Sequence, residues 1–166
     1  SRGLGDVYKR QGYYWSDSTG FGSKIANPDL SYLSSKNAGS IVFSPDGLSL
    51  AFTTSDTVGV CFYNWLQGVG FGSRIASTFS ANSTSPNNLC FHPDGKKIMF
   101  FSASPDNFLN VYDWDRTLGP INKYAAPDLA TRPSGAGVAG ACFSPDGKAV
   151  AMALLASPFV AAYMWN

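Results

Sequence analysis

Three aspartates and the chain's one histidine are the first residues whose spacing could serve chemistry. Asp46, Asp94 and Asp146 recur about every 50 residues, each inside a Phe-x-Pro-Asp-Gly pentapeptide, and His92 lies in the second copy. Recurring carboxylates could hold Ca²⁺, and a histidine could act as a general acid or base. A catalytic histidine needs partner groups that orient it, however, and none is spaced around His92. We therefore expect His92 to be a surface substitution.

The place of the aspartates in the pentapeptide explains them without a ligand. Proline sets φ at the first corner of a turn, aspartate bonds back to nearby backbone, and glycine accepts positive φ. We expect this structural role for Pro45, Asp46, Gly47, Pro93, Asp94, Gly95, Pro145, Asp146 and Gly147. The sequence predicts no catalytic residue, no metal ligand and no cofactor at these turns.

Aromatic side chains recur at a second fixed place. Tyr-x-Trp occurs four times at the same period, ending at residues 15, 65, 114 and 165. We expect these side chains to pack between neighbouring repeats, and an aromatic platform for sugars is the alternative. The predicted packing residues are Trp15, Trp65, Trp114, Trp165, Phe43, Phe91 and Phe143.

Other reactive patterns are weak. Gly20-Phe21-Gly22 and its copy at 70–72 resemble a phosphate-binding loop, but no helical pattern follows either one. Cys90 and Cys142 occupy the position of Val42, so we expect buried structural thiols rather than a disulfide or a metal site. No Gly-x-Ser-x-Gly or His-Glu-x-x-His pattern is present.

Composition excludes some classes of partner. Charged residues make up 14% of the chain and the formal net charge is +1, so no basic stripe is available to neutralise phosphates, and nucleic acid is not an expected partner. The apolar stretch 149–165 is divided by Ser157-Pro158, so we predict no membrane span. Localisation stays open between the cytoplasm and the surface of a cell or virion.

The recurring motifs divide the chain into units of four short strands. The first strands are expected at 40–43, 88–91 and 140–143, and the second at 48–53, 96–102 and 148–154. The third are expected at 59–65, 108–114 and 159–165, and a fourth follows along Gly-x-Gly. Apolar residues fall on both faces of these strands, so each sheet must be covered on both sides, as in a radial array of blades.

The Phe-Ser-Pro-Asp-Gly-Lys segment at 143–148, its two variants at 43–48 and 91–96, and the Tyr-x-Trp…Gly-Phe-Gly-Ser copies resemble the WD-repeat-like β-propellers, including the TolB-type and lactonase-type branches. The departure is that the Trp-Asp dipeptide occurs once, at Trp114-Asp115. The resemblance implies an all-β, partial β-propeller of four-stranded antiparallel blades. Because such a scaffold carries no catalytic constellation in this sequence, we expect a non-catalytic protein that binds a protein or glycan. The alternatives are a lactonase-like hydrolase and a structural spacer in a surface or phage particle protein.

The repeats define the expected boundaries. Residues 1–11 resemble a translated sequencing adapter, and we expect no fold there. Residues 12–166 should form the propeller, with two strands of one blade at 12–26, blades at 39–76 and 87–124, and an incomplete blade at 138–166. We therefore expect the chain to be a fragment from environmental DNA that forms an open arc. Its natural partners would then include its remaining blades.

Strand order predicts where a ligand would bind. The Pro-Asp-Gly turns should share one rim with the turns between the third and fourth strands. The opposite rim should carry the variable loops, where binding residues usually lie. These loops are 54–58, 103–107, 155–158, 27–38, 77–87 and 126–137. Asp56 and Asp106 match in two of them, and the third copy has no acid there.

Overall fold

The computed structural model describes residues 12–33, 38–55, 58–77, 86–102, 109–124, 138–154, 157 and 159–165. Within these residues, all regular secondary structure consists of β-strands. The expectation for residues 1–11 lies outside the described residues, as do Asp56, Asp106 and most of the loops at 77–87, 103–107, 126–137 and 155–158.

The strands form separate antiparallel sheets in chain order. One has four strands: β3 (Ala38–Phe43), β4 (Ser49–Thr54), β5 (Val60–Leu66) and β6 (Gly70–Arg74). Another has β7 (Pro86–Phe91), β8 (Lys97–Ser102), β9 (Leu109–Asp115) and β10 (Gly119–Lys123). Three strands follow, β11 (Val138–Phe143), β12 (Ala149–Leu154) and β13 (Val160–Met164). At the start of the chain, β1 (Tyr13–Ser16) pairs with β2 (Gly20–Lys24).

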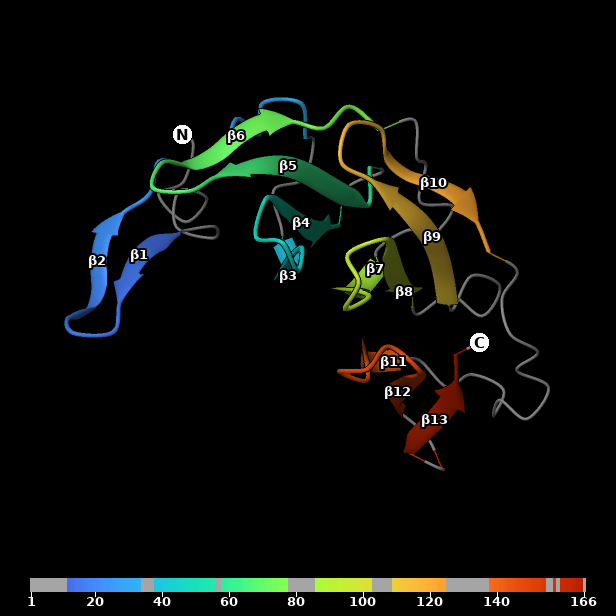
Figure 1. Cartoon of the computed structure of the whole chain (residues 1–166). Coiled ribbons are helices and arrows are strands. Elements are labelled where there is room, and N and C mark those ends of the chain that lie inside the picture. Colours follow the sequence, from blue (N-terminus) through green and yellow to red (C-terminus); the bar gives the residue numbers. More distant parts are fainter. Residues whose placement is uncertain are drawn as a thin grey trace.

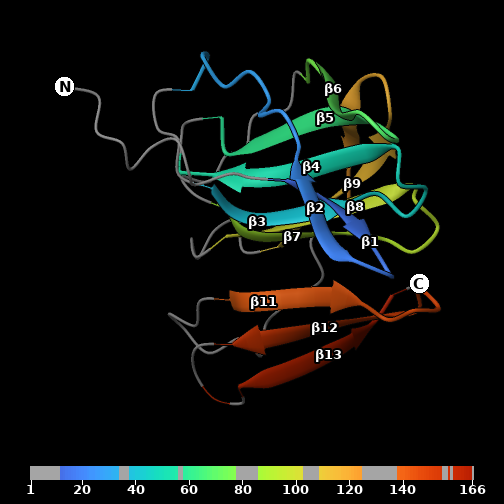
Figure 2. The same cartoon turned by 90° about the vertical axis from the view of Figure 1, so that its left-hand side faces the viewer.

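The sheets fan out in an open arc (Figure 1). Their first strands, β3, β7 and β11, lie side by side along the inner edge of the arc, and β6 and β10 lie on the outside. Seen from the side, β11–β13 run below the two four-stranded sheets, and β1 and β2 cross in front of them (Figure 2). The predicted all-β open arc of four-stranded blades is confirmed. No helix that could span a membrane occurs in the described part of the chain.

The core consists of layers between the sheets, because each strand carries apolar residues on both faces. Ala51, Val60 and Phe62 of one four-stranded sheet pack against Leu89 and Phe100 of the next. The second layer joins β7–β10 to β11–β13, through residues that include Met99, Phe101, Val111, Phe143 and Met152. The third covers part of the opposite face of β3–β6 with the segment that ends at Leu33.

The cysteines differ in burial, although two occupy matching positions. Cys61 is buried and Cys90 is half-buried, but Cys142 is exposed. The expectation of a buried Cys142 was wrong, because it lies on the face of β11–β13 that no described sheet covers. Cys61, Cys90 and Cys142 form no disulfide with one another.

Candidate functional site

The Pro-Asp-Gly rim is built by hydrogen bonds inside each turn. Asp46 Oδ1 accepts a bond from the Leu48 N–H at 2.9 Å, and Asp146 Oδ1 accepts one from the Lys148 N–H at 3.1 Å. The hydroxyls of Ser44 and Ser144 also donate to these carboxylates. These bonds, the hydroxyl first, hold the pKa of Asp46 and of Asp146 below the ordinary value.

The second turn has the same hydrogen bond between its aspartate and a backbone N–H. Asp94 Oδ1 accepts a bond from the Lys96 N–H at 2.8 Å. The glycines that close the three turns have φ of 68°, 73° and 72°, in the left-handed region. No group of three or more His, Cys, Asp or Glu side chains that could hold a metal ion occurs among the described residues.

His92 occupies the place of Ser44 and Ser144 but reaches farther. Its Nδ1 lies 2.7 Å from Asp94 Oδ1, and its Nε2 lies 3.0 Å from the carbonyl oxygen of Gly147 in the next sheet. The ring also packs edge-on against Phe143, and the side chain is 12% exposed. The expectation of a surface substitution was wrong, because the imidazole is long enough to bridge two blades.

The tryptophans pack first within their own sheets. Trp65 lies edge-on to Phe43 at 4.9 Å, Trp114 to Phe91 at 5.2 Å, and Trp165 to Phe143 at 5.6 Å between ring centroids. Two of them also contact the preceding sheet, Trp114 through Phe62 and Trp165 through Tyr124. Trp15 is 65% exposed and packs against Phe21.

On the opposite rim, residues 25–33 of the connection from β2 to β3 are held by a set that we call the Tyr32 cluster: Asp29, Tyr32, Tyr63 and Arg74. The hydroxyls of Tyr32 and Tyr63 lie 2.9 Å apart, and the Tyr63 hydroxyl donates to the Asp29 carbonyl at 2.7 Å. The Arg74 guanidinium lies 3.7 Å from the centre of the Tyr32 ring. This cluster was not predicted from the sequence, although Arg74 belongs to a recurring motif.

The charges in the Tyr32 cluster are fixed at neutral pH. Burial, followed by a hydrogen bond with Cys61, raises the pKa of Tyr32, and burial also raises the pKa of Tyr63. Hydrogen bonds from Ser31, that of its backbone N–H first, lower the pKa of Asp29. Both phenols therefore stay protonated, and an exposed carboxylate and an exposed guanidinium stand beside them.

The inner edge of the arc carries a row of matching polar and small residues. Ser40 Oγ donates to Asn88 Oδ1 at 3.1 Å, from β3 to β7. Gly140 takes the same position on β11, and a Cβ there would lie 3.1 Å from Asn88 Nδ2. This row was also missed, because the first strands were expected to be apolar. Its signal was a small or polar residue three positions before each pentapeptide phenylalanine.

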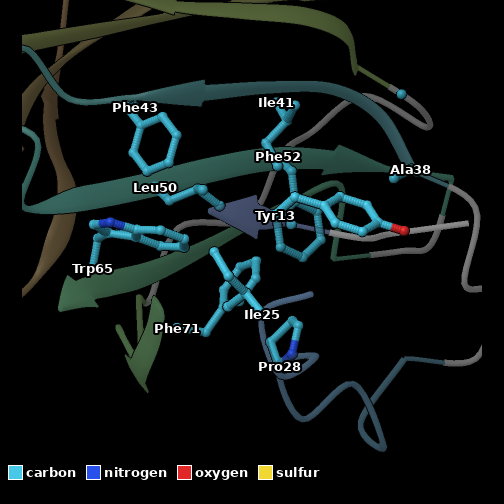
Figure 3. Close-up of a pocket in the computed structure, with 12 residues that line it drawn as sticks. Tyr13, Ile25, Pro28, Ala38, Ile41, Phe43, Leu50, Phe52, Trp65 and Phe71 are labelled. Atoms are coloured by element: carbon cyan, nitrogen blue, oxygen red, sulfur yellow. The ribbon is translucent and has the colours of Figure 1, made fainter. Parts of the chain in front are cut away.

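An apolar groove separates β1–β2 from the β3–β6 sheet (Figure 3). It encloses about 330 Å³. Its walls come from both sheets and carry no charged residue: Gly12, Tyr13, Ile25, Pro28, Ala38, Gly39, Ile41, Phe43, Leu50, Phe52, Trp65 and Phe71.

No family model and no curated protein matches the chain. Several solved structures match the chain in fold. A proposed 6-phosphogluconolactonase from Bacteroides uniformis matches at 19% identity, with 93% of this chain and 46% of that chain covered and a TM-score of 0.61. A protein from Lactobacillus plantarum matches at 17% identity over 94% and 47%, with a TM-score of 0.65. A functionally unknown protein from Desulfotomaculum acetoxidans matches at 19% identity over 94% and 44%, with a TM-score of 0.62.

These likenesses support a β-propeller-type fold and leave the WD-repeat branch unassigned. At such identities they show the fold alone. The chain spans about half the length of the structures that it matches, with 44–47% of each covered.

Proposed function

We propose that the chain is a non-catalytic binding scaffold that presents the loops of one rim to a protein or glycan. The observation that carries this proposal is the Tyr32 cluster, which holds the loop from β2 to β3 through two tyrosine hydroxyls and a cation–π contact. A segment that such contacts already hold, here residues 25–33, loses little conformational entropy when it binds a ligand. The phenol hydroxyls are already bonded to each other and to the Asp29 carbonyl. The exposed side chains of Asp29 and Arg74 are therefore the groups that a partner would contact.

The chemistry of the surface favours a ligand rich in hydroxyl or amide groups. An exposed carboxylate accepts hydrogen bonds and an exposed guanidinium donates them, so together they complement a polar neutral ligand. The ring of Tyr32 lies beneath the guanidinium and keeps it in place.

An array of glycans and immobilised peptides, probed with the chain, tests this proposal. We expect selective binding that Arg74→Ala weakens about tenfold, a typical loss for one charged contact. Lys123 occupies the matching position on β10, because it pairs with Tyr112 as Arg74 pairs with Tyr63. Lys123→Ala is therefore the matched control and should bind normally. Absence of binding together with hydrolytic turnover would contradict the proposal.

A lactonase-like hydrolase is the second candidate. It is favoured by the fold shared with the proposed 6-phosphogluconolactonase and by the Ser40–Asn88 row at the inner edge, where polar groups from several blades would meet. A direct test measures acid release from 6-phosphogluconolactone and from unphosphorylated gluconolactone at constant pH. Turnover that Asn88→Ala abolishes, in a variant that still folds, would favour this candidate over the scaffold.

A further inference from the structure

The end of the β7–β10 sheet carries an aromatic residue where the earlier units have an aliphatic one. Tyr124 directly follows β10 and matches Ile75 and Ile25, since the backbone N–H of each donates to the same position of the strand paired with it. Ile25 and Ile75 are each 4% exposed, but Tyr124 is 37% exposed. A large ring with a hydroxyl group therefore stands at the surface where the chain elsewhere buries isoleucine.

Three further positions of the β7–β10 sheet carry a charged or larger polar side chain than the matching positions of β3–β6. The differences are Lys97 for Ser49, Asp113 for Asn64 and Asn122 for Ser73. Asn122 also has a φ of 47°, in the left-handed region, which is strained for a residue with a side chain. One such difference could be incidental, but all four of these residues meet in space.

These side chains form one network, which we call the Tyr124 cluster: Lys97, Asp113, Asn122, Tyr124 and Trp165. The Tyr124 hydroxyl donates to Asp113 Oδ1 at 2.7 Å, and the Asn122 amide donates to Asp113 Oδ2 at 3.2 Å. The Lys97 ammonium lies 5.6 Å from the centre of the Tyr124 ring. The Trp165 ring of β13 lies 5.9 Å from the Tyr124 ring, with 62° between the two planes. A carboxylate, an amide and two aromatic rings thus come together where two sheets meet.

The Tyr124 cluster keeps hydrogen-bonding capacity for a ligand. Each Asp113 oxygen accepts one of these bonds and can accept another, and the exposed Asn122 amide retains its oxygen and a second N–H. The bond from the Tyr124 hydroxyl lowers the pKa of Asp113 and raises the pKa of Tyr124. At neutral pH the cluster therefore offers a charged acceptor beside a neutral phenol.

The charges of the cluster restrict the class of ligand. Lys97 interacts electrostatically with two carboxylates, those of Asp94 and Asp113. Two negative charges beside one positive charge disfavour an anion. A neutral ligand with hydroxyl groups meets no such penalty.

The cluster does not depend on what lies beside β13. Trp65 and Trp114 have their outer strands β6 and β10 in place and are half-buried, as Trp165 is. Half-burial of this tryptophan is therefore a property of the repeat. The other four members belong to the complete β7–β10 sheet or directly follow it.

We propose that the Tyr124 cluster binds a neutral pyranose sugar. The exposed ring of Tyr124 would pack against the apolar face of the sugar ring, and the polar side chains would fix its orientation. A carboxylate and an amide side by side complement two adjacent hydroxyl groups, because the carboxylate accepts hydrogen bonds and the amide also donates them. This site belongs to another sheet than the Tyr32 cluster and does not depend on it.

NMR titration of the whole isotope-labelled chain with simple methyl glycosides tests the proposal. The neutral probes are methyl β-D-glucopyranoside, methyl β-D-galactopyranoside and methyl α-D-mannopyranoside, and methyl β-D-glucuronide is the charged comparison. We expect at least one neutral probe to shift the amide signals of Asn122 and Tyr124 saturably. The glucuronide should bind at least about threefold more weakly, because its carboxylate meets the excess negative charge.

Two substitutions take their residues from the preceding sheet, which keeps the packing of the repeat. Tyr124→Ile removes the ring and should weaken binding about tenfold. Asp113→Asn keeps an acceptor but removes the charge, and should weaken binding about fivefold. Asn64→Ala changes the matching residue of the β3–β6 sheet and should bind as the wild type does. Thermal unfolding followed by circular dichroism checks that each variant folds.

Four results would overturn the proposal. No neutral probe binds, or folded Tyr124→Ile and Asp113→Asn bind as tightly as the wild type, or the glucuronide binds more tightly than every neutral probe. In the fourth, the shifted signals are those of residues 29–33, which would assign the sugar to the Tyr32 cluster instead.

Discussion

The environment of His92 differs from that of the serines at the matching positions of the other two turns. It stands where two other turns use serine, yet it joins Asp94 of its own turn to the Gly147 carbonyl of the next sheet. Gly147 has to lack a side chain there, because a Cβ would collide with the imidazole. Having histidine in place of serine therefore links this turn to the next sheet, through Gly147 and Phe143.

Replacing His92 by serine should restore the turn of the other two copies but remove this contact. The variant loses the bond to Gly147 and the edge-on contact with Phe143, so we expect the free energy of unfolding to fall by about 1–2 kcal/mol. Urea denaturation measures the difference. Lys96→Ala, in the same turn and exposed, should change stability little. Equal stability of His92→Ser and the wild type would show that the bridge contributes nothing.

The turn carboxylates predict how stability depends on pH. The pKa of Asp46 and of Asp146 is lowered from the ordinary aspartate value in the folded chain, because the serine hydroxyls and then the backbone N–H groups stabilise the charged form. A depressed folded-state pKa adds stability that is present above the unfolded value and is lost as pH falls through the folded value. We therefore expect the melting temperature to drop as pH falls below about 4.

The double variant Asp46→Asn, Asp146→Asn separates this effect from general acid denaturation. An amide can accept the turn bonds but does not titrate, so the melting temperature should fall less steeply between neutral pH and pH 3 than in the wild type. Thermal scans by circular dichroism measure both slopes. Parallel curves for the two proteins would contradict the assignment.

At the scale of elements, the Tyr32 cluster shows how one strand fixes a loop. Tyr63 projects from β5 and its hydroxyl bridges Tyr32 and the Asp29 carbonyl. Tyr63→Phe should leave both partners without this bond and cost about 1 kcal/mol. Hydrogen exchange of the Leu33 amide, which donates to the Leu30 carbonyl at 3.1 Å, should then quicken.

Tyr163→Phe is the matched control, since Tyr163 takes the same place on β13 and its hydroxyl makes no hydrogen bond within the described residues. It should leave stability and the exchange of the β2–β3 loop unchanged. An identical loss in both variants would mean that the effect comes from the ring environment and not from the bridging hydroxyl.

The strands were predictable because their signals are local and repeated. Phe43, Phe91 and Phe143 end first strands in the structure as predicted, and each is followed by a tight turn. The contacts of Tyr32 and His92 were not predictable, because each depends on a segment that folding brings in from another sheet or loop. Cys142 shows a further limit: a residue with an apolar pattern is buried only where a neighbouring sheet covers it.

At the scale of the whole molecule, the outward side of β11–β13 is a face that no other described sheet covers. The outward side of β11–β13 exposes Val160 to 68% and Met164 to 73%, together with Cys142, Ala151 and Ala153. Open sheet faces and edges of this kind promote association.

We expect the isolated chain to associate through this face in a concentration-dependent way. Val160→Lys places a charge in the middle of the face and should shift the population toward monomer in light scattering coupled to size exclusion. Thr117→Lys adds the same charge on the exposed β9–β10 turn and should not. A monomeric wild type at high concentration would show that the exposed face of β11–β13 is not an association surface.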